Sequence, residues 1–149
     1  MRAVRMGWIA LTLVGCSRPA DKPAETADAA PAAISLADVA GTWSVRSSLL
    51  DDPGKSVTYE LTATADSSGW SITFPGGDPI PLRMVAVEGD SIVTEAGPFA
   101  SQMRKGQQAH SRVVTRLQGD RMVGTVDVRY EASGSDSTAS LDLEGTRKQ

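Results

Sequence analysis

The chain has 149 residues, a length that allows one small folded domain. Its 15 Lys and Arg residues against 18 Asp and Glu residues give a net charge of −3, and the cations are scattered along the sequence. Such a chain lacks the basic surface that attracts nucleic acid or anionic lipid headgroups, so we expect no nucleic-acid partner.

The first 15 residues have the layout of an export signal. Arg2 and Arg5 supply a positive start, and a short apolar run follows over residues 6–14. This run is too short to cross about 30 Å of hydrocarbon as a helix, which needs roughly 20 apolar residues. We therefore predict a cleaved signal peptide at residues 1–15, whose removal makes the mature chain two charges more negative.

The end of this signal, Leu13-Val14-Gly15-Cys16, resembles the lipobox of bacterial lipoproteins. The resemblance implies cleavage before Cys16 and attachment of acyl chains such as palmitate to its thiol and new amine. Two or three acyl chains hold a protein stably on a bilayer. In some Gram-negative bacteria, an Asp directly after the lipidated cysteine keeps a lipoprotein in the inner membrane. This chain has Ser17 there, which favours the periplasmic face of the outer membrane. The alternative is an unlipidated Cys16, which as the only cysteine cannot form an intramolecular disulfide.

Residues 16–37 are predicted to be the lipidated cysteine and a disordered tether. From Ser17 to about Ser35 the composition is dominated by Ala, Pro, Asp, Glu and Lys, which cannot bury a core. Residues 36–40 are expected to form a short helical turn that leads into a folded domain, placed at residues 38–149.

This domain shows apolar and polar residues alternating with a period of two, separated by turn sequences such as Glu88-Gly89-Asp90 and Gln118-Gly119-Asp120. Such runs are typical of strands with one buried and one wet face. The sequence predicts an all-β fold, an antiparallel meander of eight or nine strands that forms an up-and-down barrel. The predicted strands are 42–48, 56–65, 69–75, 82–88, 91–97, 100–104, 110–118, 121–132 and 137–147.

The domain opens with Gly41-Thr42-Trp43, which resembles the Gly-x-Trp signature of lipocalins and other calycins. The resemblance implies that Trp43 plugs the closed end of the barrel and that Arg147 packs across it. An Arg over an indole ring is worth roughly 0.5–2 kcal/mol. The chain departs from the family pattern, since it has no Thr-Asp-Tyr segment, no terminal helix and a shorter domain. A generic β-barrel or sandwich is the alternative.

No catalytic, cofactor or metal signature stands out. His110 is the only histidine, and the alternation places it with Arg112 and Arg116 on the solvent side. One histidine and a lipidated cysteine do not make a zinc site, and neither a Gly-x-Ser-x-Gly motif nor a calcium or phosphate loop is present. We therefore expect a protein that is not an enzyme, although a triad whose members meet only in the fold could still use His110.

The period-two pattern weakens between Gly97 and Gly106. One interpretation is a loop at the mouth of a pocket, with Phe99 and Met103 touching a ligand and Arg104 facing an anionic group. The alternative is a bent edge strand with Phe99 buried.

Two functions are therefore open. In the first, the barrel binds a small apolar or amphipathic ligand, which predicts a dry cavity of roughly 300 Å³ or more. In the second, the barrel is filled and its outer face or loops contact another envelope protein. The inward positions mix large residues such as Tyr59 and Phe74 with small ones such as Ala63 and Gly124, so they leave either a cup or a solid core.

Overall fold

The computed structural model describes residues 32–131 and 137–149. The signal peptide, Cys16 and the tether up to residue 31 lie outside the described residues, so the lipid anchor stays a prediction. In the described part of the chain, no helix is long and apolar enough to cross a bilayer.

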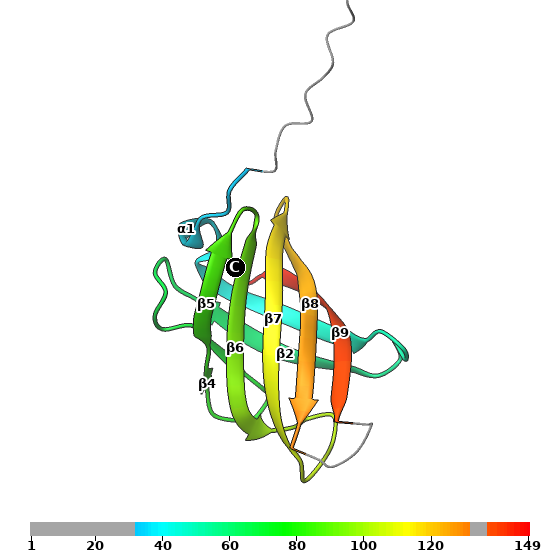
Figure 1. The fold of residues 1–149 in the computed structure, drawn as a ribbon. Coiled ribbons are helices and arrows are strands. Elements are labelled where there is room, and N and C mark those ends of the chain that lie inside the picture. The colour runs from blue at the N-terminus through cyan, green and yellow to red at the C-terminus, as the bar shows by residue number, and fades with distance from the viewer. Residues whose placement is uncertain (1–31, 132–136) are drawn as a thin grey trace, which may run out of the picture.

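Nine antiparallel strands form one sheet that curls into a nearly closed barrel (Figure 1). The strand order across the sheet is β4-β3-β2-β1-β9-β8-β7-β6-β5. The predicted all-β class and up-and-down barrel are confirmed. The elements are α1 (Leu36–Val39), β1 (Gly41–Leu49), β2 (Ser56–Ala63), β3 (Ser71–Thr73), β4 (Ile80–Pro81), β5 (Arg83–Glu88), β6 (Ser91–Ala100), β7 (Gln108–Gln118), β8 (Arg121–Tyr130) and β9 (Thr138–Arg147).

The predicted strand at 100–104 is wrong. Strand β6 continues to Ala100, across a bulge between Ala96 and Phe99, and the following residues form a loop. Gly97 makes the bulge possible: its φ is +127°, and an added Cβ would lie 2.8 Å from the Ala109 carbonyl oxygen. The loop is closed by the Ser101 N–H, which donates to the Gln107 carbonyl oxygen at 2.9 Å.

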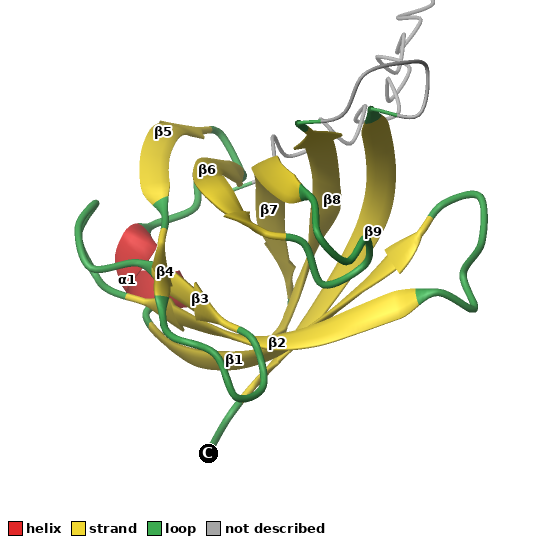
Figure 2. Ribbon diagram, turned by 90° about the horizontal axis from the view of Figure 1, so that it is seen from below, coloured by secondary structure: helices red, strands yellow, loops and turns green. Residues whose placement is uncertain are grey.

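The two edges of the sheet are joined by the chain itself. β4 and β5 lie at opposite edges of the strand order, yet only Leu82 separates them in sequence. Figure 2 shows β4 leading directly into β5. The Leu82 N–H donates to the Trp70 carbonyl oxygen at 2.8 Å, which fixes this crossing point against the start of β3. The barrel is thus closed here by a covalent connection and not by a further ladder of hydrogen bonds.

The predicted alternation supplies the core. Trp43, Val45, Ile92, Met122 and Leu141 are fully buried on the inner face of their strands. The strand predicted at 56–65 is shorter in the structure: β2 ends at Ala63, and Ala65 is exposed.

Helix α1 closes one end of the barrel. The Trp43 Nε1–H donates to the Val39 carbonyl oxygen at 2.8 Å, and the Arg147 guanidinium lies 4.4 Å from the Trp43 ring centroid. The Arg147 guanidinium also donates to the Asp38 carbonyl oxygen at 2.6 Å and to the Ala40 carbonyl oxygen. Trp43 and Arg147 are the pair that the resemblance singles out. Together they attach helix α1 to the first and last strands, β1 and β9, which pair with each other.

The folded domain begins before Asp38. Ser35 caps α1, where its side chain accepts from the Ala37 N–H and its own N–H donates to Asp38. Ile34 and Leu36 pack against the core, and the Ile34 N–H donates to the Gly89 carbonyl oxygen at 2.8 Å. Residues 34–37 thus belong to the barrel and not to the tether.

Replacing Arg147 with Ala should lower the free energy of unfolding by about 1–3 kcal/mol, because it removes the contact with Trp43 and two hydrogen bonds to the helix. Urea unfolding followed by tryptophan fluorescence measures this. Lys148→Ala is the matched control: it removes only a half-exposed ion pair with Glu60, which is worth at most about 1 kcal/mol. Equal losses in the two variants would contradict the proposed role of Arg147.

Candidate functional site

The barrel holds a cavity of about 70 Å³ in the half that lies away from α1. Its mouth is formed by the end of β6 and the loop that follows, where Phe99, Ser101, Gln102 and Met103 line it. Apolar side chains make up most of the remaining wall. They are Val57, Leu61, Trp70, Ile72, Phe74, Leu82, Ala109, Val113, Val126, Val128, Leu141 and Leu143.

The cavity is much smaller than the 300 Å³ expected for a ligand-binding barrel. Aromatic side chains fill most of the space: the Tyr59 and Phe74 rings meet edge to face at 5.5 Å, and Phe74 and Phe99 lie 6.0 Å apart. The small inward residues therefore interdigitate with large ones and do not gather into a wide cup. What remains is a narrow site that opens at one end.

The hydroxyls of two buried residues on neighbouring strands open into this cavity without a partner in the described part of the chain. Thr94 is 3% exposed and Ser111 is 7% exposed, and both line the cavity wall. Neither side chain makes a hydrogen bond with any other residue that the structure describes. Two other buried hydroxyls have partners: Ser47 bonds Tyr59 at 3.1 Å, and Thr115 donates to the Ile92 carbonyl oxygen at 3.3 Å. The buried Tyr130 phenol also lines the cavity without a hydrogen bond among the described residues.

Tyr59 contributes a neutral phenol to the cavity wall. Burial raises the pKa of Tyr59 to about 12, and the hydrogen bond with Ser47 opposes this effect only partly. The phenol therefore keeps its proton over the whole physiological range.

The three predicted mouth residues divide between two surfaces. Phe99 and Met103 line the cavity, whereas Arg104 lies over the Tyr130 ring at 4.1 Å and lines a separate outer depression. The bulged end of β6 that carries Phe99 pairs with β7 but not with β5, so the alternative of a bent edge strand describes the backbone here, although Phe99 is only half-buried.

Thr94 and Ser111 were not singled out from the sequence. The signal was available, since both occupy positions where the alternation of β6 and β7 places side chains inward. A hydroxyl at such a position can hydrogen-bond another group of the protein core or contact a ligand. Only its neighbours in three dimensions distinguish the two.

His110 lies on the outer face of the barrel, as predicted. Its Nε2 is 3.0 Å from Glu131 Oε1, and both side chains are partly exposed. Within residues 32–131 and 137–149, no group of three or more His, Cys, Asp or Glu side chains is placed to hold a metal ion.

A larger and more open depression of about 1260 Å³ lies on the outer face of β5–β9. The strand register aligns a row of polar side chains across it, which we call the charged row. Each member pairs with the next on the neighbouring strand. The members are Arg83, Glu95, Arg112, Asp127 and Ser140.

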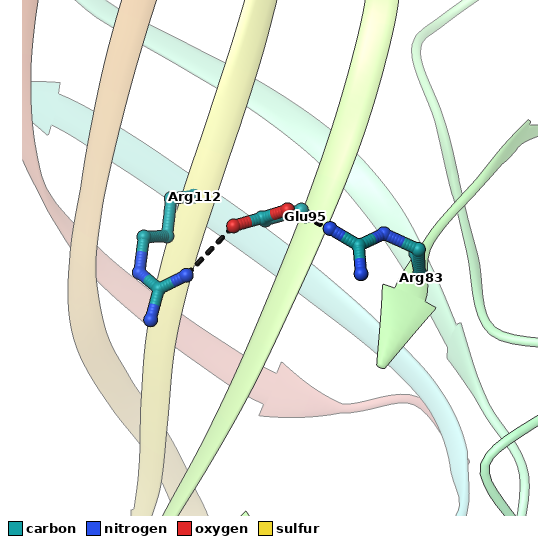
Figure 3. Close-up of polar contacts among 3 residues, drawn as sticks. All are labelled: Arg83, Glu95 and Arg112. Carbon is teal, nitrogen blue, oxygen red and sulfur yellow. Dashed lines mark hydrogen bonds and ion pairs between the residues drawn. The ribbon is translucent and has the colours of Figure 1, made fainter. Parts of the chain in front are cut away.

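Glu95 lies between two arginines in the charged row (Figure 3). Arg112 Nη1 donates to Glu95 Oε1 at 2.7 Å, and Arg83 bonds the other carboxylate oxygen. The hydrogen bond from Arg112 is the main reason why the pKa of Glu95 lies below its ordinary value. Desolvation opposes it, and the charges of Arg83 and Arg112 lower the pKa further.

Glu95→Gln should remove an acid-dependent part of the stability. Because the folded-state pKa is lowered, the ionised form stabilises the fold above the unfolded pKa of about 4.3, and this contribution is lost as the pH falls through the folded pKa. The difference in unfolding free energy between wild type and variant should therefore shrink from pH 6 toward about pH 3. Glu88→Gln, an exposed acid on β5 without an ion pair in the described chain, is the control. A difference independent of pH would contradict the assignment.

Tyr59→Phe should change the alkaline stability. Above about pH 10 the phenol ionises in the unfolded chain but not in the fold, so wild-type stability falls as the pH rises toward about 12. The variant lacks this loss, although at neutral pH it is less stable by about 1 kcal/mol because Ser47 loses its partner. Denaturant unfolding between pH 8 and about 11.5 measures both effects. Parallel pH profiles would show that the Tyr59 phenol is not held neutral by the fold.

Comparison of the chain with protein-family models, with curated proteins and with solved structures finds no match. What the protein does must therefore be inferred from its own residues. Two features are available for this: the narrow cavity with its two unpartnered hydroxyls, and the charged row on the outer face.

Proposed function

We propose that this protein is a non-catalytic lipoprotein of the cell envelope whose barrel binds a small apolar or amphipathic ligand. Acyl chains on Cys16 anchor it to the membrane, on the periplasmic face of the outer membrane. The observation that supports ligand binding is the pair of buried hydroxyls, Thr94 and Ser111, that face an otherwise apolar cavity without a protein partner.

Free energy favours this interpretation of the two hydroxyls. A hydroxyl shut off from water without a hydrogen bond costs about 1–3 kcal/mol, so the Thr94 and Ser111 oxygens, which open into the cavity, need a partner there. A barrel that only needed a filled core would gain stability from Val at Thr94 and Ala at Ser111. A ligand or an ordered water in the cavity supplies the partner that the chain does not.

The shape of the cavity restricts the ligand. Only a slender group fits between the Tyr59, Phe74 and Phe99 rings, so a chain or a small ring enters while any larger part stays at the mouth. Met103, an unbranched and adaptable side chain, lines that mouth. An anchor at Cys16 would hold the barrel near a bilayer, where slender apolar molecules are concentrated.

The charged row supports a second candidate, a protein-interaction module of the envelope. The outer depression is far larger than the cavity and is crossed by alternating charges from four strands, with Ser140 on a fifth. Paired charges of this kind contribute more to the specificity of an interface than to its affinity.

Native mass spectrometry separates the two candidates. We would use the unlipidated mature chain (residues 16–149 with Cys16→Ser), exported by an ordinary signal peptide so that it meets envelope molecules. A bound mass of a few hundred daltons that is released on denaturation is the expected result. A bare polypeptide, together with a partner recovered by crosslinking in intact envelopes, would favour the interaction module.

A cavity-filling variant tests whether any bound mass sits inside the barrel. Ala109 is buried in the cavity wall, so Ala109→Leu should eliminate the bound mass, at a cost in stability of about 1–3 kcal/mol. Ala100→Leu, at the exposed end of β6, is the matched control and should keep the bound mass. Retention by both variants would place the ligand outside the barrel.

A further inference from the structure

We propose that the cavity selects an electrically neutral ligand, a hydrocarbon chain whose buried end carries a hydroxyl or ketone oxygen, and that Thr94 and Ser111 bind this oxygen. The inference rests on the proposed ligand-binding function and specifies its chemistry. Three features of the cavity wall support it, and they concern charge, the positions of the two hydroxyls and the partners of the remaining polar groups.

The cavity wall carries no charged side chain. None of the residues that line it is Asp, Glu, Lys, Arg or His. An ion transferred into such surroundings loses its hydration without gaining a counter-charge, which costs several kcal/mol. A carboxylate or ammonium group is therefore excluded from the interior, although it can remain in water at the mouth.

The two unpartnered hydroxyls are neighbours on the same face of the sheet. Thr94 pairs with Val113 and Ser111 pairs with Ala96, so the two side chains lie on the diagonal of adjacent strands β6 and β7. Diagonal neighbours are about 7–8 Å apart, a spacing at which one polar atom between them can be reached from both sides. A single ligand oxygen would then satisfy both buried groups.

The remaining polar groups in the deep wall are already used. Ser47 and Tyr59 bond each other across β1 and β2, and Thr115 donates to the Ile92 carbonyl oxygen. Because a hydroxyl both donates and accepts, Thr94 and Ser111 can bind an alcohol or a ketone oxygen but cannot neutralise an ion. The deep wall thus offers one polar position, next to β6 and β7, surrounded by hydrocarbon. The Tyr130 phenol lies farther out, beside Ala109 and Phe99 at the mouth.

The test uses four probes that share an eight-carbon chain: 1-octanol, 2-octanone, octanoate and octylammonium. Binding to the unlipidated mature chain is measured at pH 7 by ligand-observed NMR and by quenching of tryptophan fluorescence, since Trp70 lines the cavity. We expect the alcohol and the ketone to bind at least about 10-fold more tightly than either ion, because the ions must be desolvated.

Substitution of the two hydroxyls tests the position of the ligand oxygen. Thr94→Val with Ser111→Ala keeps the shape of the wall and should weaken octanol binding by about 10-fold, while binding of octane is unchanged or stronger. Thr125→Val, on the exposed face of β8, is the control for a Thr-to-Val change. Unfolding curves for each variant establish that the barrel is intact.

The outcomes distinguish this inference from the proposed function. Octanoate or octylammonium binding as tightly as octanol would overturn the selection of a neutral ligand but leave ligand binding in place. Unchanged octanol binding in the Thr94→Val, Ser111→Ala variant would overturn the role of the hydroxyls. If neither octane nor any of the four probes binds, both this inference and the ligand-binding function fail.

Discussion

The contact of Arg147 with Trp43 links the two ends of the folded chain, and the rest of the barrel depends on it. Trp43 lies near the start of β1 and Arg147 ends β9, and these two strands are paired in register with each other. The same guanidinium holds the carbonyl oxygens of Asp38 and Ala40, so helix α1 is fixed against the barrel end. Gly41 lies under it with φ +134°, where an added Cβ would be 2.7 Å from Arg147 Nη1. A side chain at this position would displace the guanidinium.

The sequence predicted the fold well because its main signal is a period of two. Positions such as Tyr59, Ile72 and Leu141 point inward as predicted, and tight turns separate the strands. The errors lie where this period is broken. At Gly97 a bulge lets β6 resume its pairing with β7, and sequence reasoning divided the strand in two at that point. Positive φ values at a glycine and the pairing partner of a strand depend on neighbours that are distant in sequence.

The candidate site was predicted less completely. Phe99 and Met103, which attracted attention as an aromatic and a flexible apolar residue in a polar segment, line the cavity, and their contact with a ligand stays a prediction. The cavity volume could not be predicted, because it is a small difference between two large volumes: that of the barrel interior and that of the side chains that fill it. Thr94 and Ser111 acquire significance only from what surrounds them: each would be ordinary if a carbonyl oxygen lay within reach.

The single residue between β4 and β5 limits how far the barrel can expand. Consecutive Cα atoms are 3.8 Å apart, so Pro81 at one sheet edge and Arg83 at the other can never be more than about 7.6 Å apart. Leu82 itself lines the cavity, and the edges therefore cannot separate beside it to admit a wider molecule. Beside Leu82, covalent geometry, and not core packing alone, therefore sets an upper limit on ligand girth.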